Sequence, residues 1–176
     1  MCRRDRDDGD RTWSDPADTS WTTRPWHSDF MRVALAQFAA TTDPAENLRQ
    51  VQAAVERAAA ADARLAVFPE AMVCSFARPR IEAAEPLDGP WASAVRTAAR
   101  QAGITVIVGM FTPGSSGKVR NTLLVTGPGL EAHYDKLHLF DAYGYRESDQ
   151  IEPGAELVLI AVDGIGIGLA LSLIHI

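Results

Sequence analysis

After the first thirty residues, short apolar runs alternate with stretches whose apolar residues recur at helical spacing. Three continuous apolar runs have the length of buried strands, namely "RVALAQF" (32–38), "RLAVF" (64–68) and "ITVIVGMF" (104–111). The stretches between them, 43–61 and 90–102, repeat their apolar residues every three or four positions, as amphipathic helices do. Buried strands that alternate with helices are typical of a sheet covered by helices. The pattern therefore predicts an α/β fold.

Residues that start and end helices mark both predicted helices. Asp43 is suited to the N-cap, Pro44 to the first helical position, and Glu46 to completing a capping box. Pro90 is likewise placed to begin the second helix, and Gly103 to end it. We therefore expect both helices to have well-defined ends.

Two hairpins are predicted in the second half of the chain. "VRNTLLVT" and "LEAHYDK" flank the turn sequence "GPG" (127–129). "ELVLIAV" and "IGIGLAL" flank Asp163-Gly164, a dipeptide that strongly favours a two-residue hairpin turn. These hairpins are expected to add antiparallel strands to the sheet.

Composition narrows the classes of partner and the cellular compartment. A chain of 176 residues, 47% hydrophobic and 23% charged, is typical of one globular domain. Its net charge of −6 argues against nucleic-acid or anionic-membrane partners, and no apolar stretch approaches the ~20 residues that span a bilayer. The two cysteines, Cys2 and Cys74, show no disulfide or metal-binding spacing, which favours the reducing cytoplasm.

Residues 1–30 differ from the rest of the chain. They contain no Ile, Leu or Val, but seven Asp, five Arg and three of the four Trp. Low aliphatic content combined with dense charge predicts disorder. We interpret this segment as a disordered tail or a spurious upstream extension; a tail that docks through its tryptophans is the alternative.

Glu70 directly follows a predicted buried strand, in "VFPEA" (67–71). A carboxylate at the end of a strand lies at the edge of the sheet, where functional groups gather. Partial burial there would let Glu70 accept and donate a proton near neutral pH. A solvated loop glutamate is the alternative that this motif alone leaves open.

Lys136 lies among aromatic and apolar residues in "HYDKLHLF" (133–140), where an unpaired ammonium would be costly. We expect it to have a carboxylate partner and to be able to stabilise a developing oxyanion. A surface lysine whose stem packs on the strand is the alternative. His133 and His138 have no neighbouring ligand at a metal-binding spacing, which favours packing or hydrogen bonding.

Three further features complete the search for functional residues. Glu147, in "GYRESD", is a third candidate, with a surface acid as its alternative. Cys74 is expected to be a buried and inert thiol. The stretch "GIGIGL" (164–169) fails the dinucleotide-binding fingerprint, because Leu169 stands where the third glycine is needed and the stretch continues a strand pattern. This failure disfavours a nucleotide-binding domain.

Taken in order, these motifs resemble those of the carbon–nitrogen hydrolase, or nitrilase, superfamily, in its amidase-like branch. The resemblance covers residues 31–171 and rests on "VALAQF", "VFPEA", "YDKLHLFD", "ESD" and "PG" in that order. It implies an α-β-β-α sandwich, in which two sheets pack face to face with helices outside. It also implies that residues 31–171 are the N-terminal part of such a domain.

The resemblance further implies a Glu–Lys–Cys site. Glu70 would be the general base, Lys136 the group that stabilises the oxyanion, and Glu147 an additional active-site carboxylate. Ser172 stands after "GLAL", at the nucleophile position, where the family has cysteine. Because a serine hydroxyl is a much weaker acid than a thiol, we expect this chain to be inactive.

The reaction implied is hydrolysis of a non-peptide carbon–nitrogen bond, such as an amide to carboxylic acid plus ammonia, with no cofactor and no metal. The expected partners are a small amide or nitrile substrate and, at full length, further copies of the chain. The ending "SLIHI" (172–176) matches nothing expected of the family and is interpreted as a foreign tail on a truncated domain. A non-catalytic relative kept for binding or assembly is the alternative function.

Overall fold

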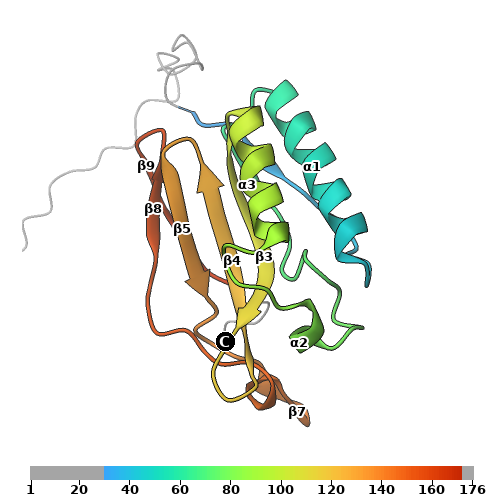
Figure 1. Cartoon of the computed structure of the whole chain (residues 1–176). Coiled ribbons are helices and arrows are strands. Elements are labelled where there is room, and N and C mark those ends of the chain that lie inside the picture. Colours follow the sequence, from blue (N-terminus) through green and yellow to red (C-terminus); the bar gives the residue numbers. More distant parts are fainter. Residues whose placement is uncertain (1–29, 172–176) are drawn as a thin grey trace, which may run out of the picture. The chain divides into compact units, whose positions relative to one another are not determined.

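The computed structural model describes residues 30–171, which contain a five-stranded sheet (Figure 1). Its strands lie in chain order, namely β1 (Val33–Leu35), β2 (Leu65–Val67), β3 (Thr105–Pro113), β4 (Val119–Gly127) and β5 (Leu130–Asp135). The first three are parallel to one another, and β4 and β5 each run antiparallel to the preceding strand. The strands predicted within 64–68 and 104–111 and the first predicted hairpin are confirmed.

Two of the sequence predictions concern residues outside this range. The predicted tail, 1–30, lies outside the described residues except for Phe30, which is exposed. Residues 172–176, with Ser172 at the expected nucleophile position, also lie outside them. Within 30–171, none of the helices combines the length and the hydrophobicity that crossing a bilayer requires.

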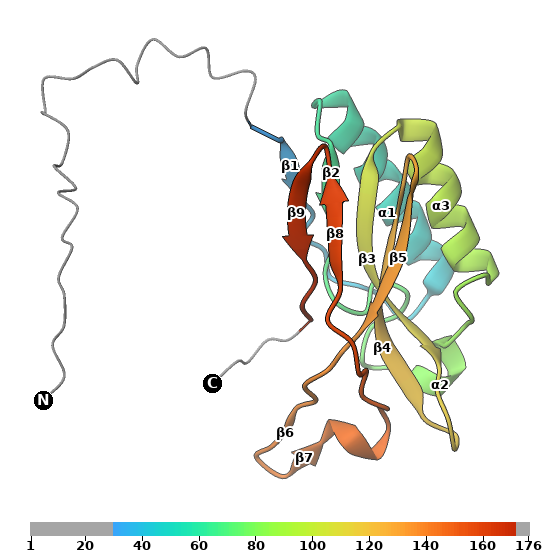
Figure 2. The ribbon, with the colours of Figure 1, turned by 90° about the vertical axis from the view of Figure 1, so that its left-hand side faces the viewer.

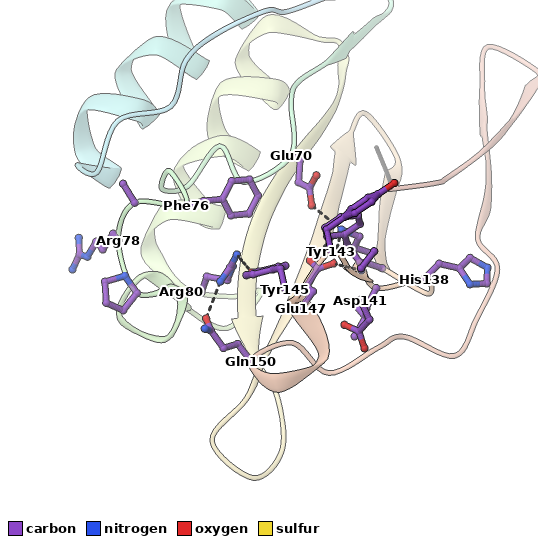
Figure 3. A pocket seen from close by; sticks show the side chains of 16 residues that line it. Glu70, Phe76, Arg78, Arg80, His138, Asp141, Tyr143, Tyr145, Glu147 and Gln150 are labelled. Atoms are coloured by element: carbon purple, nitrogen blue, oxygen red, sulfur yellow. Dashed lines mark hydrogen bonds and ion pairs between the residues drawn. The ribbon is translucent and has the colours of Figure 1, made fainter. Parts of the chain in front are cut away.

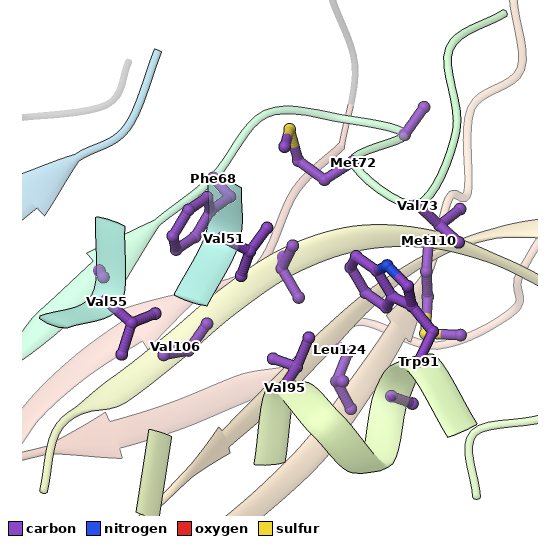
Figure 4. Close-up of a cluster of buried hydrophobic side chains, with 14 of the residues drawn as sticks. Val51, Val55, Phe68, Met72, Val73, Trp91, Val95, Val106, Met110 and Leu124 are labelled. Carbon is purple, nitrogen blue, oxygen red and sulfur yellow. The ribbon is translucent and has the colours of Figure 1, made fainter. Parts of the chain in front are cut away.

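One face of the sheet is covered by α1 (Pro44–Ala60) and α3 (Pro90–Ala102), which pack side by side (Figures 1 and 2). A shorter helix, α2 (Arg80–Ala83), precedes α3. Asp43 caps α1 through its side chain, and Gly103 ends α3 in the left-handed conformation at φ 69°, as predicted. Buried side chains fill the space between helices and sheet (Figure 4), among them Val51, Val55, Trp91, Val95, Val106 and Met110.

The other face of the sheet packs against a hairpin of β8 (Leu159–Val162) and β9 (Ile165–Gly168) (Figure 2). Its turn holds Asp163 and Gly164 at φ 49° and 81°, the positive values that a type I′ turn requires. The buried cluster that joins the hairpin to the sheet consists of Leu65, Ile107, Leu123, Val125, Tyr134, Ile160, Val162, Leu169 and Leu171. Residues 31–171 thus form three layers, helix, sheet and sheet; they do not form the outer helical layer of the sandwich.

Strand β1 is shorter and more exposed than its apolar sequence predicts. It spans three residues and pairs with β2 alone, at the edge of the described sheet. Leu35 is 81% exposed as a result. The prediction of a buried strand was therefore wrong for 32–38, because an apolar run does not distinguish an edge strand from a central one.

The start of α1 also differs from the predicted capping box. Glu46 forms an ion pair with Arg49 and does not reach back to the backbone of Asp43. The N–H of Asp43 donates instead to Oγ1 of Thr41, at 3.1 Å. Thr41, which precedes the helix, therefore accepts the hydrogen bond from the N–H of Asp43 that was expected to go to Glu46.

A small folded segment follows β5 where the sequence predicts a polar loop. Strands β6 (Asp141–Ala142) and β7 (Tyr145–Arg146) form a hairpin, and the 3₁₀ helix η2 (Glu147–Asp149) follows directly. Tyr143 and Gly144 take positive φ values, 54° and 79°, at the hairpin turn. Elements of two or three residues are too short for hydrophobic periodicity to reveal them.

Candidate active site

The backbone around Lys136 is fixed by contacts on both sides. Lys136 directly follows β5, and its N–H donates to the carbonyl oxygen of Asn121 on β4, at 2.9 Å. Its own carbonyl oxygen accepts from the N–H of Gly154, also at 2.9 Å. A Cβ at Gly154 would lie 2.3 Å from the carbonyl oxygen of Asp135, so the close approach requires glycine. These contacts keep the side chain of Lys136 inside the protein, where the residue is 5% exposed.

Glu70 lies in a tight bend just beyond the end of β2. Ala71, the next residue, is held at φ 57°, a left-handed value that costs an alanine about 1 kcal/mol. A Cβ at Gly109 on β3 would lie 2.6 Å from the nitrogen of Ala71, so glycine allows the bend to pack directly on β3. Strain retained beside a candidate catalytic group is typical of functional sites. The bend therefore determines where the Glu70 carboxylate lies.

The side chains of Lys136, Glu70 and Glu147 form a charged cluster. Figure 3 labels its two carboxylates, those of Glu70 and Glu147. The Nζ of Lys136 lies 3.2 Å from Oε1 of Glu70 and 2.9 Å from Oε2 of Glu147. Glu147 also accepts a hydrogen bond from the N–H of Phe140 at 2.7 Å, and it is 4% exposed. The expectation that Lys136 has a carboxylate partner is confirmed. The alternative of a surface Glu147 is wrong, because η2 directs this side chain inward.

The charges of this cluster favour a protonated Lys136. Burial by itself lowers the pKa of Lys136, but the hydrogen bond from Lys136 to Glu147 and the charges of Glu70 and Glu147 outweigh burial and raise it. Lys136 is therefore an ammonium at neutral pH. One ammonium and two carboxylates give the cluster a net charge of −1 when both acids are ionised.

Asn121 is a site residue that the sequence reasoning missed. It is fully buried on β4, and its Nδ2 donates to Oε1 of Glu70 at 2.5 Å, the oxygen that Lys136 also contacts. Its Oδ1 is buried and has no hydrogen-bond donor among residues 30–171. The sequence feature that could have revealed Asn121 is the polar Asn-Thr pair inside the largely apolar strand "VRNTLLVT". A buried amide held on a carboxylate fixes where that carboxylate points.

Beside the charged cluster lies a cavity of about 960 Å³ (Figure 3). Its wall combines the bend after β2, the segment that leads into α2, and the segment from the end of β5 to η2. The lining residues are Glu70, 76–80, Lys136, 138–143, Tyr145, Glu147 and Gln150. The candidate catalytic groups thus form part of the wall of a space large enough for a small substrate.

The arrangement supplies two of the functions that acyl transfer requires. The carboxylate of Glu70 can accept a proton, and the ammonium of Lys136 can donate hydrogen bonds to an oxygen that becomes negative. Among the described residues, the cavity wall contains no serine and no cysteine. A nucleophile would therefore have to come from elsewhere in the chain.

The other polar candidates do not join this cluster. Cys74 is fully buried, and burial raises the pKa of its thiol, in agreement with the predicted inert role. His133 and His138 are both exposed. Residues 30–171 contain no group of three His, Cys, Asp or Glu side chains arranged to hold a metal ion.

Residues 32–171 match the family model for carbon–nitrogen hydrolases. Among curated proteins, a hydrolase of Mycobacterium tuberculosis is 52% identical over 143 residues, which are 79% of this chain and 51% of that protein. The deaminated glutathione amidase of Escherichia coli O157:H7 is 31% identical over 144 residues, 79% of this chain and 55% of that protein. The chain thus spans about half the length of these curated relatives.

Two solved structures resemble the fold over a similar range. A CN-hydrolase superfamily protein of Xanthomonas campestris superposes with a TM-score of 0.69 at 31% identity, covering 78% of this chain and 51% of that one. An amidase from Nesterenkonia sp. superposes with a TM-score of 0.67 at 26% identity, covering 80% of this chain and 54% of that one. The predicted fold class, α/β of this sandwich type, is confirmed by these neighbours.

Proposed function

Because the chain belongs to the carbon–nitrogen hydrolase family, we propose that the cavity beside Lys136 binds small primary amides for hydrolysis to carboxylic acid and ammonia. The observation that carries the proposal is the ion pair of Lys136 and Glu70, at 3.2 Å, in the wall of that cavity. Relatives named as amidases support the choice of an amide. Glu70, Lys136 and a cysteine thiol would carry out the reaction.

In the first half of the reaction, Glu70 takes the proton of the thiol, and the thiolate attacks the carbonyl carbon of the amide. Lys136 donates hydrogen bonds to the oxyanion of the tetrahedral intermediate. When the carbon–nitrogen bond breaks, the proton held by Glu70 passes to the leaving nitrogen. Ammonia departs, and a thioester remains on the enzyme.

In the second half, Glu70 takes a proton from water, and the resulting hydroxide attacks the thioester carbonyl. The carbon–sulfur bond breaks, the acid is released, and Glu70 returns the proton to the sulfur. Both hydrogen bonds that Glu70 accepts, from Asn121 and Lys136, reach its Oε1. We assign the proton transfers to the other oxygen, Oε2.

Glu147 has a different role in this proposal. It holds the Lys136 ammonium through both of its carboxylate oxygens and is itself fixed by the N–H of Phe140. Its contacts orient Lys136 toward the oxyanion. Glu147 therefore acts as a positioning residue for the ammonium.

The nucleophile is the part of the proposal that residues 30–171 do not supply. Ser172, at the position where the family has cysteine, lies outside the described residues. A mutant of the amidase from Nesterenkonia sp. AN1 shows the result of Michael addition of acrylamide at its active-site cysteine, which supports a thiol mechanism here. We define the thiol form as the protein carrying Ser172→Cys.

Comparison of the two nucleophiles tests the proposed function. The same protein with Ser172 is expected to release no ammonia from aliphatic amides, because a carboxylate is too weak a base to activate a serine hydroxyl. The thiol form is expected to release ammonia and acid in equal amounts, measured with a coupled ammonia assay. Ammonia release by the serine chain that disappears on Glu70→Gln would contradict the thiol mechanism. A thiol form that binds amides without hydrolysing them would instead support the non-catalytic alternative.

Replacing Asn121 by leucine in the thiol form is expected to weaken catalysis without abolishing it. Asn121→Leu takes one hydrogen-bond donor from the Glu70 carboxylate and should lower kcat/KM about 10- to 100-fold, as the loss of one hydrogen bond to a charged group predicts. Steady-state kinetics at pH 7 measure the effect, and thermal unfolding checks the fold.

Thr112→Val is the matched control for Asn121. Thr112 is buried on the adjacent strand, and its hydroxyl contacts Thr122. This variant loses a buried hydrogen bond that does not involve Glu70, so thermal stability should fall while kcat/KM stays close to that of the parent. Equal kcat/KM values for Asn121→Leu and the parent would remove Asn121 from the site.

A further inference from the structure

Arg80 connects two segments of the cavity wall, as Figure 3 shows. It begins α2, and its Nη1 donates to Oε1 of Gln150 and its Nη2 to the hydroxyl of Tyr145, both at 2.7 Å. These two partners flank Glu147 in the chain, because Tyr145 precedes it on β7 and Gln150 follows η2. One guanidinium therefore holds the chain on both sides of the carboxylate that contacts Lys136.

The Arg80 end of this connection is anchored to the sheet. The guanidinium carbon lies 5.1 Å from the ring centre of Phe76, and that ring packs edge to face against Phe111, which is fully buried on β3. The N–H of Glu85, which follows α2, donates to the carbonyl oxygen of Phe111 at 3.1 Å. By contrast, β6, β7 and η2 contain only two or three residues each. Such short elements have few hydrogen bonds of their own, so contacts from outside determine where they lie.

The Tyr145 end of the connection leads to Glu147 through Phe140. The ring of Tyr145 stacks on that of Phe140, with 6.2 Å between the ring centres. The backbone of Phe140 is bonded twice to Glu147. Its N–H donates to Oε2 of Glu147 at 2.7 Å, and its carbonyl oxygen accepts from the N–H of Glu147 at 3.0 Å. A continuous series of contacts therefore runs from Arg80 to the carboxylate that holds Lys136.

Fold stability alone does not account for the arrangement of Arg80. Its Nε is buried and has no acceptor among residues 30–171. A buried donor without an acceptor lowers stability, and such a group in a folded protein calls for an explanation other than packing. The two hydrogen bonds toward the segment that carries Glu147 supply one.

We propose that Arg80 is a positioning residue for the reaction: by holding the chain on both sides of Glu147, it keeps the Lys136 ammonium directed at the oxyanion. This inference rests on the proposed amidase function. Arg80 acts through Glu147 and donates neither a proton nor a hydrogen bond to the reacting atoms. A displacement of about 1 Å at a group that binds the oxyanion is enough to lower a rate about 100-fold.

Replacing Arg80 by methionine in the thiol form tests the proposal. With valeramide, Arg80→Met should lower kcat about 10- to 100-fold and leave KM nearly unchanged, because Lys136 acts on an oxyanion that forms only after the amide is bound. Tyr145→Phe keeps the ring on Phe140 and removes one of the two acceptors, so its kcat should lie between those of the parent and Arg80→Met. A rise in KM at the parental kcat would mean that Arg80 contacts the substrate, and would overturn the proposal.

A double variant shows whether Arg80 acts through Glu147. In the Glu147→Gln background, Arg80→Met should lower kcat far less than it does in the parent, because the contact that Arg80 supports has already been weakened. Equal effects of Arg80→Met in both backgrounds would show that Arg80 acts by another route, which would also overturn the proposal.

Arg96→Met is the matched control. Arg96 likewise joins distant parts of the chain, through Glu131 and the carbonyl oxygen of Leu87, but it does not line the cavity. This variant should lose thermal stability and keep the parental kcat. If it lost as much kcat as Arg80→Met, the effect of Arg80 would be a general loss of stability and not positioning.

Hydrogen–deuterium exchange needs no turnover, so it separates failure of this proposal from failure of the amidase proposal. The N–H groups of Gln150 and Ile151 donate to the carbonyl oxygen of Glu147 and report on η2. They should exchange about tenfold faster in Arg80→Met than in the parent, and at the parental rate in Arg96→Met. Faster exchange in a protein that hydrolyses no amide would support the link from Arg80 to η2 and contradict the amidase proposal. Hydrolysis of amides with both exchange and kcat unchanged in Arg80→Met would overturn the role of Arg80 alone.

Discussion

Replacing Glu70 by glutamine in the thiol form is expected to lower kcat about 10⁴-fold, the upper end of what a general acid–base group contributes. The effect should be large because the same carboxylate moves a proton in both halves of the reaction. The fold should remain, since Glu147 still pairs with Lys136 and glutamine has nearly the same shape as glutamate. Single-turnover kinetics with valeramide measure the loss, and thermal unfolding checks the fold.

Glu56→Gln is the control for this prediction. Glu56 is exposed on α1, so the variant makes the same change of charge and shape outside the cavity, and its kcat should match that of the parent. A Glu70→Gln enzyme that keeps a substantial share of the parental kcat would mean that another group serves as the base.

Lys136→Met is expected to damage both catalysis and stability. The loss of the donor to the oxyanion should lower kcat about 10²- to 10³-fold. The change also leaves the carboxylates of Glu70 and Glu147 without their ammonium, and removing one partner of a buried pair costs about 3–5 kcal/mol. Urea unfolding at pH 7 measures the second effect, and steady-state kinetics measure the first.

The dependence of this stability loss on pH follows from the ionisation of Lys136. The raised pKa of Lys136 means that its contribution is fully present at neutral pH and is lost only as the pH rises beyond the unfolded value of about 10.4. The difference in unfolding free energy between the parent and Lys136→Met should therefore shrink as the pH rises past that value.

A double variant separates the two effects of Lys136. Adding Glu147→Gln to Lys136→Met removes the buried charge that lost its partner, so stability should return while kcat stays low. Recovery of kcat along with stability would show that Lys136 supports the fold and takes no part in the reaction.

The helices could be predicted from the sequence because their end signals are local. Pro44 at the start of α1, and Pro90 and Gly103 at the two ends of α3, act through their own backbone conformations, and Asp43 acts through a side-chain hydrogen bond to the first turn of α1. The exposure of Leu35 depends on which strands flank β1, and the sequence around a strand does not contain that information.

The candidate site was predictable where the residues follow strands and not where they depend on tertiary contacts. Glu70 follows the apolar strand β2 and Lys136 directly follows β5, so the expectation that Glu70 lies at the sheet edge needed only the strand pattern. The inward direction of Glu147 depends on the short η2 turn and on the N–H of Phe140. Asn121 reaches Glu70 across 51 residues of chain, a contact that no local pattern contains.

Arg80 shows the same limit for the cavity. It lies in a four-residue helix that hydrophobic periodicity does not detect, and it reaches Gln150 and Tyr145 across 70 and 65 residues of chain. These contacts form only once the chain is folded, so the sequence alone does not show which residues make up the cavity wall.

Trapping the acylated enzyme tests most directly whether Glu70 and Lys136 surround the carbon that reacts. The thiol form is mixed with valeramide, quenched within one turnover, and mapped by peptide mass spectrometry. We predict a pentanoyl thioester at position 172 that forms far more slowly in the Glu70→Gln enzyme. Acylation at Cys74, or formation at the parental rate without the Glu70 carboxylate, would contradict the account.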